Sequence, residues 1–418
     1  MAGLASMRRG VPIRARVAAA GPTAREALAE MEPRPAGLHA RFADLEAGRQ
    51  LRQVRNVATG QLHDETVPSA QMGREQRTPS RRHRRPASGG NGANGGNADA
   101  GDTGEASLAA AAPRAETAAN ERWRALLAET GPILADGAMG TMLFANGLQF
   151  GDPPEVWNLS QPDVVRRIHR GYLSAGSRIV MTNTFGGNRL RLQLHGLQDR
   201  VDDLNRTAAI LLRKEVDAAA DDGARRALVA GDIGPSGEIM APLGTLEEAE
   251  AVDVFAEQAA ALIAGGVDLI WIETMSHLSE IRAAIDGTRR VSAEIPIVAT
   301  MTFDTRGYTM MGVSPEQAVA SLAAWGADAI GGNCGNGPDE LLPVIEKMHA
   351  TAPDVTLVAK SNAGMPELVD LRAVYRADPP TMAEAGVAFR AAGARIIGAC
   401  CGSTPDHLRA MAGALGVG

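Results

Sequence analysis

From residue 123 onward, short apolar runs alternate with longer segments of helical periodicity. The runs are almost continuously hydrophobic and end in Gly, Asn, Asp or Thr, a pattern typical of parallel strands that are buried on both faces. Eight strands are therefore expected, at residues 133–137, 178–185, 227–234, 269–274, 297–303, 329–334, 356–364 and 395–402.

The segments between these runs predict helices, and several carry helix-start signals. Pro315 follows Ser314, Pro338 precedes two acidic residues, and Thr381 precedes Ala383 and Glu384. The expected helices span residues 162–175, 199–220, 247–265, 278–290, 314–325, 338–350 and 381–392. Eight strand–helix units over about 290 residues favour a closed (β/α)8 barrel, a TIM barrel, over an open doubly wound sheet. We place this domain at residues 122–416.

Residues 1–115 have a different composition and are predicted to be a low-complexity, largely disordered segment. They contain a Gly/Asn-rich run between residues 88 and 104, which cannot bury a core. They also carry a net charge of +6, whereas the remainder carries −13. An Arg cluster at 81–85 is either a nucleic-acid contact or a solvated tail, and basic runs favour the second interpretation. The acidic barrel argues against nucleic acid or anionic membrane as its partner.

Hydropathy and cysteine usage indicate the class of protein. No apolar run approaches the roughly 18 residues of a spanning helix, and no signal peptide is apparent. The chain has 3 cysteines, which cannot all pair, so a reducing, cytoplasmic compartment is expected.

Polar and reactive residues gather where the predicted strands end. In a (β/α)8 barrel the active site forms at the carboxyl ends of the strands, so these side chains are expected at one mouth. The residues are Asp136, Asn183, Asp232, Glu273, Asn333, Cys334, Asn362, Cys400 and Cys401.

The cysteines are the strongest candidates for chemistry. Cys334 ends the sixth predicted strand, and Cys400 and Cys401 end the eighth, so the two strand ends can face each other. Successive strand residues point to opposite faces, so a turn at Gly402 must bring Cys401 back inward. Three thiolates leave one position of a tetrahedral Zn2+ ion open for a substrate. The alternative is that free cysteines pack as small hydrophobes.

Two acidic residues suggest how a substrate is held. Asp136 begins Asp-Gly-Ala-Met-Gly-Thr, whose glycine-flanked turn exposes N–H groups suited to a carboxylate; the alternative is a helix start capped by Thr141. Glu273 follows a buried strand and needs a partner there, either a substrate ammonium or a neighbouring Arg or Lys. Three thiolates, a carboxylate and this loop suit a small amino acid that bears its own thiol, and the expected chemistry is thiol alkylation.

The motifs that carry these residues resemble the homocysteine S-methyltransferase family. They occur in the family's order between about residues 122 and 416: DGAMGT, TNTFGGNR, GDIGPSGE, ET at 273–274, GGNCG and GACCGSTPDHLRAM. The resemblance implies a (β/α)8 barrel with catalytic zinc on Cys334, Cys400 and Cys401. It also implies homocysteine contacts from Asp136, Gly137, Ala138, Met139, Gly140 and Glu273, and we add Asn183 to this set.

The implied reaction transfers a methyl group to the homocysteine thiolate and gives methionine. The expected donor is betaine or another methyl-onium compound; the alternatives are S-methylmethionine or a methylcobalamin-carrying corrinoid protein. The chain departs from the animal betaine enzymes at Gly186, where those enzymes have Tyr. A different class, a non-catalytic zinc or thiol-sensing protein, predicts no metal-dependent alkylation. The sequence does not predict the oligomeric state.

Overall fold

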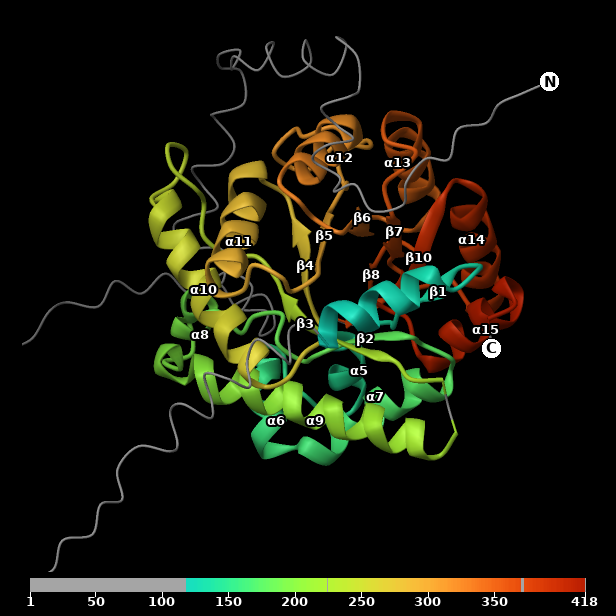
Figure 1. The fold of residues 1–418 in the computed structure, drawn as a ribbon. Coiled ribbons are helices and arrows are strands. Elements are labelled where there is room, and N and C mark those ends of the chain that lie inside the picture. Colours follow the sequence, from blue (N-terminus) through green and yellow to red (C-terminus); the bar gives the residue numbers. More distant parts are fainter. Residues whose placement is uncertain (1–117, 224, 370–371, 418) are drawn as a thin grey trace, which may run out of the picture. The chain divides into compact units, whose positions relative to one another are not determined.

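Eight strands of the described residues form one parallel sheet that curls into a nearly closed barrel (Figure 1). The structure is a computed structural model that describes residues 118–417 except 224, 370 and 371. The strands are β1 Ile133–Leu134, β2 Ile179–Met181, β3 Leu228–Ile233, β4 Leu269–Met275, β5 Ile297–Met301, β6 Ala329–Cys334, β7 Leu357–Ser361 and β10 Ala394–Ala399. All eight predicted strands and the predicted barrel are thus confirmed, whereas the prediction for residues 1–115 lies outside the described residues.

The sheet order is β1-β10-β7-β6-β5-β4-β3-β2. A parallel bridge between Ala135, just after β1, and Ile179 in β2 joins the two ends of this order. Because β7 lies between β6 and β10, the ends of β6 and β10 are separated by one strand. This spacing is the one that the thiol cluster requires.

The predicted helices form a ring outside the strands (Figure 1). They are α7 Pro162–Ser174, α9 Val201–Asp221, α10 Glu248–Ala264, α11 Leu278–Val291, α12 Pro315–Ala324, α13 Pro338–Thr351, α14 Pro379–Ala391, and the unpredicted α15 Pro405–Leu415. The loops hold α5 Gly140–Ala145, α6 Trp157–Ser160, α8 Arg189–Gln193, the turns η1 Pro154–Val156 and η2 Gln198–Arg200, and a hairpin of β8 Glu367–Val369 and β9 Arg372–Val374.

Two of the predicted helix starts are confirmed and one is wrong. Ser314 caps α12 in a capping box, and Pro338 is the first residue of α13. Helix α14 begins at Pro379 rather than near Thr381. Its cap is Asp378, whose carboxylate accepts the Thr381 backbone N–H at 2.9 Å, so Thr381 lies inside the first turn.

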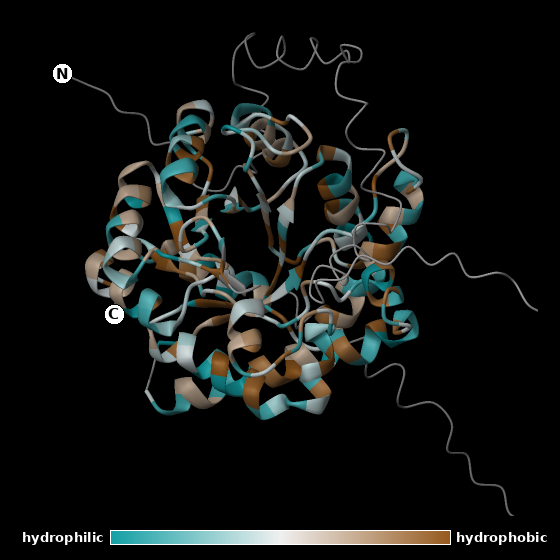
Figure 2. Cartoon of the chain, turned by 180° about the vertical axis from the view of Figure 1, so that it is seen from behind, coloured by the Kyte–Doolittle hydropathy of each residue, from teal (hydrophilic) through white to brown (hydrophobic). Residues whose placement is uncertain are grey.

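Apolar side chains pack in two layers. One lies between the strands and the ring helices, whose hydrophilic and hydrophobic residues alternate around the ring in Figure 2. The other fills the barrel interior around Trp271. Trp123 and Leu126, from the helical residues 118–128, join this inner layer, and Arg122 bonds Asp268 just before β4. This helix therefore closes the amino-terminal end of the barrel and leaves the carboxyl end for the site.

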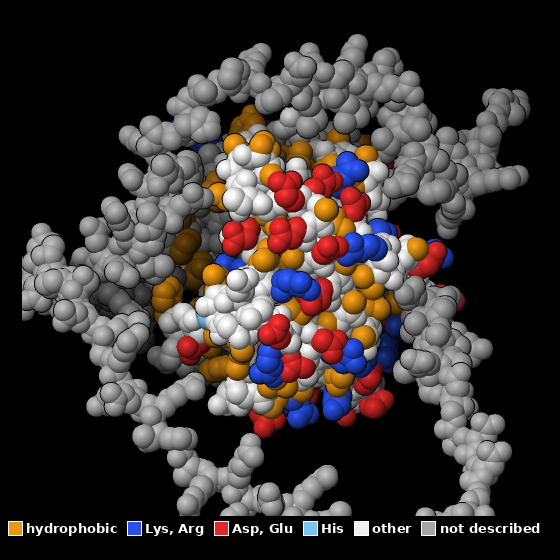
Figure 3. Space-filling model, turned by 90° about the vertical axis from the view of Figure 1, so that its left-hand side faces the viewer, with side chains coloured by type: hydrophobic (Ala, Val, Ile, Leu, Met, Phe, Trp, Pro, Cys, Tyr) orange, Lys and Arg blue, Asp and Glu red, His pale blue; other side chains and the backbone are white. Residues whose placement is uncertain are grey.

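The outer face of the ring mixes charges of both signs (Figure 3). Ion pairs such as Arg189–Glu257 and Arg290–Asp253 link neighbouring helices there. In the described part of the chain, no helix is long and apolar enough to cross a membrane.

Candidate active site and metal centre

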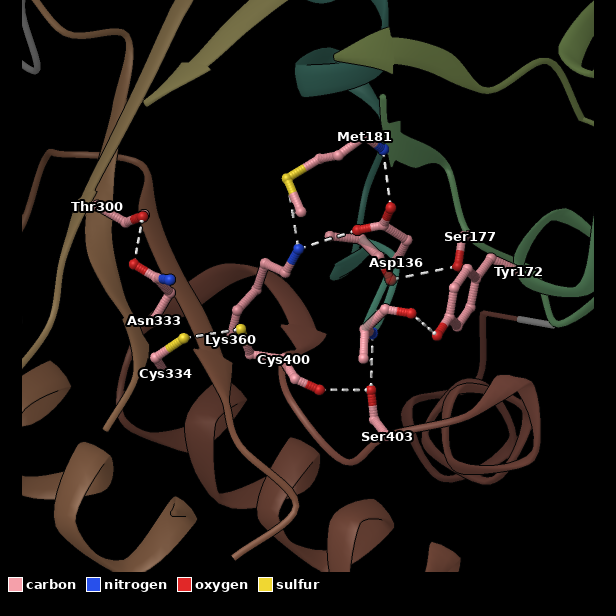
Figure 4. Close-up of polar contacts among 12 residues, drawn as sticks. Asp136, Tyr172, Ser177, Met181, Thr300, Asn333, Cys334, Lys360, Cys400 and Ser403 are labelled. Atoms are coloured by element: carbon pink, nitrogen blue, oxygen red, sulfur yellow. Dashed lines mark hydrogen bonds and ion pairs between the residues drawn. The ribbon is translucent and has the colours of Figure 1, made fainter. Parts of the chain in front are cut away.

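The three cysteines come together at the carboxyl end of the barrel. Cys334 is the last residue of β6, and Cys400 and Cys401 follow β10 directly. The Sγ atoms all lie within 4.8 Å of one another, and those of Cys334 and Cys400 are 2.9 Å apart (Figure 4). Within the described residues, this is the group of three or more His, Cys, Asp or Glu side chains with the geometry to hold a metal ion.

The backbone around the cysteines explains how adjacent residues share one site. Strand β10 ends at Ala399, before both cysteines, and Gly402 turns the chain at φ +82°. The Cys400 N–H donates to the Ser361 carbonyl, and the Cys401 carbonyl accepts the Ala363 N–H, so the end of β7 and the loop after it fix both residues. Cys334 itself has φ +57°, an uncommon conformation for a residue with a Cβ.

The chemistry of these three groups fits zinc. Hydrogen bonds with Cys400 and Cys401, together with burial, raise the pKa of the Cys334 thiol. Hydrogen bonds with Cys334 and Cys400 lower the pKa of Cys401 to about 4. One thiolate therefore forms readily, and further ionisation beside it needs a cation. Three soft sulfur donors at one point match the preference of Zn2+, which thiolates bind strongly.

A buried lysine beneath the thiols was missed in the sequence. Lys360 of β7 is fully buried, and its Nζ lies 2.9 Å from Asp136 Oδ1 and 3.5 Å from Met181 Sδ (Figure 4). It also lies 5.1 Å from the Trp271 ring centroid. Asp136 and other nearby anionic groups raise the pKa of Lys360 despite its desolvation. The sequence feature that could have revealed it is a lysine inside the apolar run LVAKS, because a buried charge requires a counter-charge.

The Asp136 loop is pinned so that its backbone faces the cavity. The Asp136 Oδ2 atom accepts the Met181 N–H at 2.7 Å, and Ser403 Oγ accepts the Ala138 N–H at 3.0 Å (Figure 4). A Cβ at Gly137 would lie 2.5 Å from Ser403 Oγ, so glycine is required there.

Two backbone donors of this loop stay open. Within the described residues, the N–H groups of Met139 and Gly140 have no acceptor. Helix α5 begins at Gly140 after Met139, without a side-chain cap. The interpretation of Thr141 as its cap is therefore wrong: Thr141 lies inside the helix, and its hydroxyl accepts the Gly402 N–H.

Two further carboxyl groups that line the same cavity have oxygens without a hydrogen-bond partner. Glu273 and Asp232 are each 5% exposed, and Glu273 Oε2 and Asp232 Oδ1 accept no hydrogen bond from the described residues. Burial raises the pKa of Glu273 to about 8, with the Cys400 thiol adding to the effect and Lys360 opposing it. Burial and the Glu273 charge raise the pKa of Asp232. Three carboxyl groups therefore share one ammonium group, and an additional cation would be stabilised here.

The raised pKa of Glu273 predicts a pH-dependent stability. Between its ordinary pKa and about pH 8, the folded metal-free protein binds a proton that the unfolded chain has lost. The free energy of unfolding therefore falls as pH rises across this range, by at most about 1.4 kcal/mol per pH unit. Glu273→Gln is expected to reduce this slope in urea unfolding at pH 5.5 and 7.5. The exposed control Glu316→Gln should keep it; equal slopes in all three proteins would contradict the assignment.

The asparagines at the strand ends are mainly committed to structure. Asn183 lines the cavity, but its Nδ2 donates to the Pro154 carbonyl at 2.8 Å and to Asn158. The Asn333 Oδ1 atom accepts from the Thr274 N–H and the Thr300 hydroxyl (Figure 4). Both residues therefore hold loops around the site.

One cavity unites the candidate residues. It is lined by the whole 136–140 loop and by Asn183, Asp232, Glu273, Cys334, Lys360, Cys400 and Cys401, and it continues to the first loop and α8. Of the lining residues, Phe185 supplies the one Phe, Tyr or Trp ring. Trp157 of α6 packs against the core and does not line it.

The backbone of Gly186 lies directly against the Glu155 carboxylate. The Gly186 N–H donates to Glu155 Oε1 at 2.7 Å, and a Cβ on Gly186 would lie 3.0 Å from that oxygen. A side chain at this position would press on Glu155, which is buried.

Comparisons with known proteins agree with this site. Residues 133–415 match the model of the family described as Homocysteine S-methyltransferase. Methionine synthases of Mycobacterium leprae and Mycobacterium tuberculosis are 34% and 35% identical over 296 residues, which is 68% of this chain and 24% of each relative. The chain thus spans about a quarter of the length of these relatives.

Solved structures give the same family. The metallated form of the Escherichia coli homocysteine methyltransferase MmuM is 26% identical, with a TM-score of 0.59 over 69% of this chain and 98% of that one. Its oxidized form is 25% identical, with a TM-score of 0.60 and the same coverage. The barrel, its ordered motifs and these matches together place the chain in the homocysteine S-methyltransferase family.

Proposed function

We propose that this protein transfers a methyl group to the thiol of L-homocysteine and forms L-methionine. The observation that carries the proposal is the meeting of three cysteine Sγ atoms within 4.8 Å in a cavity that also holds an unpartnered buried glutamate. A thiol-bearing amino acid matches both features, because its sulfur suits the metal centre and its ammonium group suits the carboxylate.

The metal ligands in this proposal are Cys334, Cys400 and Cys401. Zinc held by them would supply a Lewis acid that favours the deprotonated form of the substrate thiol near neutral pH. No protein base is then needed to keep the sulfur nucleophilic. The φ of +57° at Cys334 and the turn at Gly402 aim the three sulfurs at one point.

The remaining residues orient the amino-acid part of homocysteine. Glu273 accepts its ammonium group, and in doing so loses the proton that burial favours in the free protein. The open N–H groups of Met139 and Gly140 donate hydrogen bonds to its carboxylate. Asp136, held by Lys360 and the Met181 N–H, fixes the loop between these groups.

The donor that we propose is betaine or another methyl-onium compound. Carboxyl groups around the cavity favour a cationic donor, although Phe185 gives one ring where an aromatic cage needs several. A second candidate is methyl transfer from a corrinoid protein. It is favoured by the similarity of this chain to a segment that makes up about a quarter of the length of two methionine synthases.

A donor panel tests this function. The purified protein, with its zinc content measured, is incubated with homocysteine and betaine, S-methylmethionine or methylcobalamin, and methionine is quantified. Methionine from an onium donor supports the proposal, and methionine from methylcobalamin alone supports the second candidate. A zinc-loaded protein that methylates from none of them would contradict both and favour a thiol-sensing role.

Metal removal gives a prediction on the same assay. Dialysis against a chelator under reducing conditions is expected to abolish methionine formation, because three neighbouring thiols cannot all ionise without a cation. Zinc should restore activity at about one equivalent per chain, whereas Mg2+, which prefers oxygen ligands, should not. Full activity in protein shown by metal analysis to lack zinc would contradict the proposal.

A further inference from the structure

The cavity extends beyond the residues that the proposed function uses. From the thiol cluster it continues to the first loop, to Arg191 of helix α8 and to His195 in the turn after that helix. Arg191 lies in α8, and His195 lies in the turn that follows this helix, where its N–H donates to the Leu192 carbonyl at 3.0 Å. The outer end of the cavity thus holds an arginine and a histidine beside the buried carboxyl group of Glu155.

The Arg191 guanidinium is positioned but unpaired. A Cβ at Gly237 would lie 2.7 Å from Arg191 Cδ and 3.1 Å from Nη1, so the loop after β3 runs directly against this side chain. Within the described part of the chain, the guanidinium donates no hydrogen bond and forms no ion pair. Its neighbour in sequence, Arg189, does form one, with Glu257 at 2.6 Å.

Glu155 does not account for Arg191. This buried carboxylate lies across the same part of the cavity and feels the Arg191 charge. Its Oε1 atom is bonded instead to the Gly186 N–H at 2.7 Å, and no ion pair joins the two side chains. The fork of donors on Arg191, suited to a carboxylate, therefore remains available.

The two ends of the cavity have opposite electrostatic character. Three carboxyl groups and three thiols lie at the inner end, against a single ammonium group, whereas the outer end holds Arg191 and His195 beside one carboxyl group, that of Glu155, whose pKa is raised by burial. A ligand that spans the cavity is favoured when its cationic end points inward and its anionic end outward.

We infer that Arg191 and His195 form a subsite for the carboxylate of a zwitterionic onium methyl donor. The inference rests on the proposed function and adds the class of donor. The methyl carbon bonds to the homocysteine sulfur while its bond to the donor nitrogen or sulfur breaks. The electron pair stays on that atom and neutralises it. The donor carboxylate does not change and acts as the anchor.

Arg191→Met tests the subsite, with Arg189→Met as the matched control on the same helix. Two donors are compared with each protein: betaine, which carries a carboxylate, and trimethylsulfonium, which does not. For Arg191→Met we expect KM for betaine to rise about 10- to 100-fold, the worth of a charge-assisted hydrogen bond. KM for homocysteine and turnover of trimethylsulfonium should stay within about twofold, and Arg191→Lys should recover part of the loss.

Binding separates this inference from the proposed function. Calorimetric titration of betaine into zinc-loaded protein with homocysteine present should show binding that Arg191→Met weakens and Arg189→Met does not. If wild type binds betaine in this way but forms no methionine, the proposed function fails and the subsite stands. If betaine does not bind wild type, or Arg191→Met affects both donors equally or neither, the subsite is wrong.

Discussion

Cys401→Ser is expected to lose both zinc and activity while the barrel stays folded. The thiol of Cys401 lies within 4.8 Å of two others and is the most acidic of the three, with a pKa lowered to about 4. Substituting a residue that hydrogen-bonds to a metal ligand commonly reduces metal affinity or activity about 10- to 100-fold. Loss of a ligand itself should therefore reduce methionine formation by at least about 100-fold. Zinc per chain, measured by metal analysis after brief chelator treatment, should fall in parallel.

Folding of this variant can be checked separately. Serine is close in size to cysteine, and the Cys401 carbonyl keeps its bond from the Ala363 N–H. The metal-free variant and metal-free wild type should therefore unfold at similar temperatures. Cys334→Ser should behave alike, because it removes the proposed ligand at the end of β6. An active, zinc-replete Cys401→Ser protein would remove this residue from the metal centre.

Of the substitutions proposed, Lys360→Met is expected to lower the free energy of unfolding most. The ammonium group is fully buried and 2.9 Å from Asp136, with Asp232 and Glu273 nearby. Breaking a buried ion pair from one side leaves an uncompensated charge, which costs about 3–5 kcal/mol. Urea unfolding at pH 7 measures the change. Lys347→Met, which removes an exposed lysine at the end of α13, should cost far less.

Two further measurements identify the cause of this loss. In Lys360→Met the buried carboxyl groups favour their protonated forms, so the folded state binds more protons than the unfolded state. The variant should therefore recover stability as pH falls from 7 to 5. Adding Asp136→Asn should also restore part of the loss. If the loss is unchanged by pH and by the second substitution, it comes from packing around Trp271 instead of from charge.

The barrel could be predicted from sequence because its strands are buried on both faces. Such strands appear as apolar runs, and a run such as LIWIET ends where β4 delivers Glu273 to the mouth. Local start signals were less secure. Thr381 looked like a helix start, yet Asp378 three residues earlier provides the cap, because both residue types suit such positions.

The site was only partly predictable, for a different reason. Cys334, Cys400 and Cys401 stood out because each ends a predicted strand and the chain has no other cysteine. Lys360 lies inside a strand, and its partner Asp136 is 224 residues away, so nothing local announces the pair. Arg191 lies on α8, a five-residue helix too short for a periodic signal, and His195 lies in the turn after it.

The contact between Glu155 and Gly186 bears on how relatives of this protein diverge. A side chain at 186 would need the Glu155 carboxylate to move by a few tenths of an ångström, since the Cβ would sit 3.0 Å from Oε1. The two positions should therefore have coevolved. Relatives with an aromatic residue at 186 are expected to lack an acid at 155. Introducing a tyrosine at 186 alone would therefore make only one of the two linked changes.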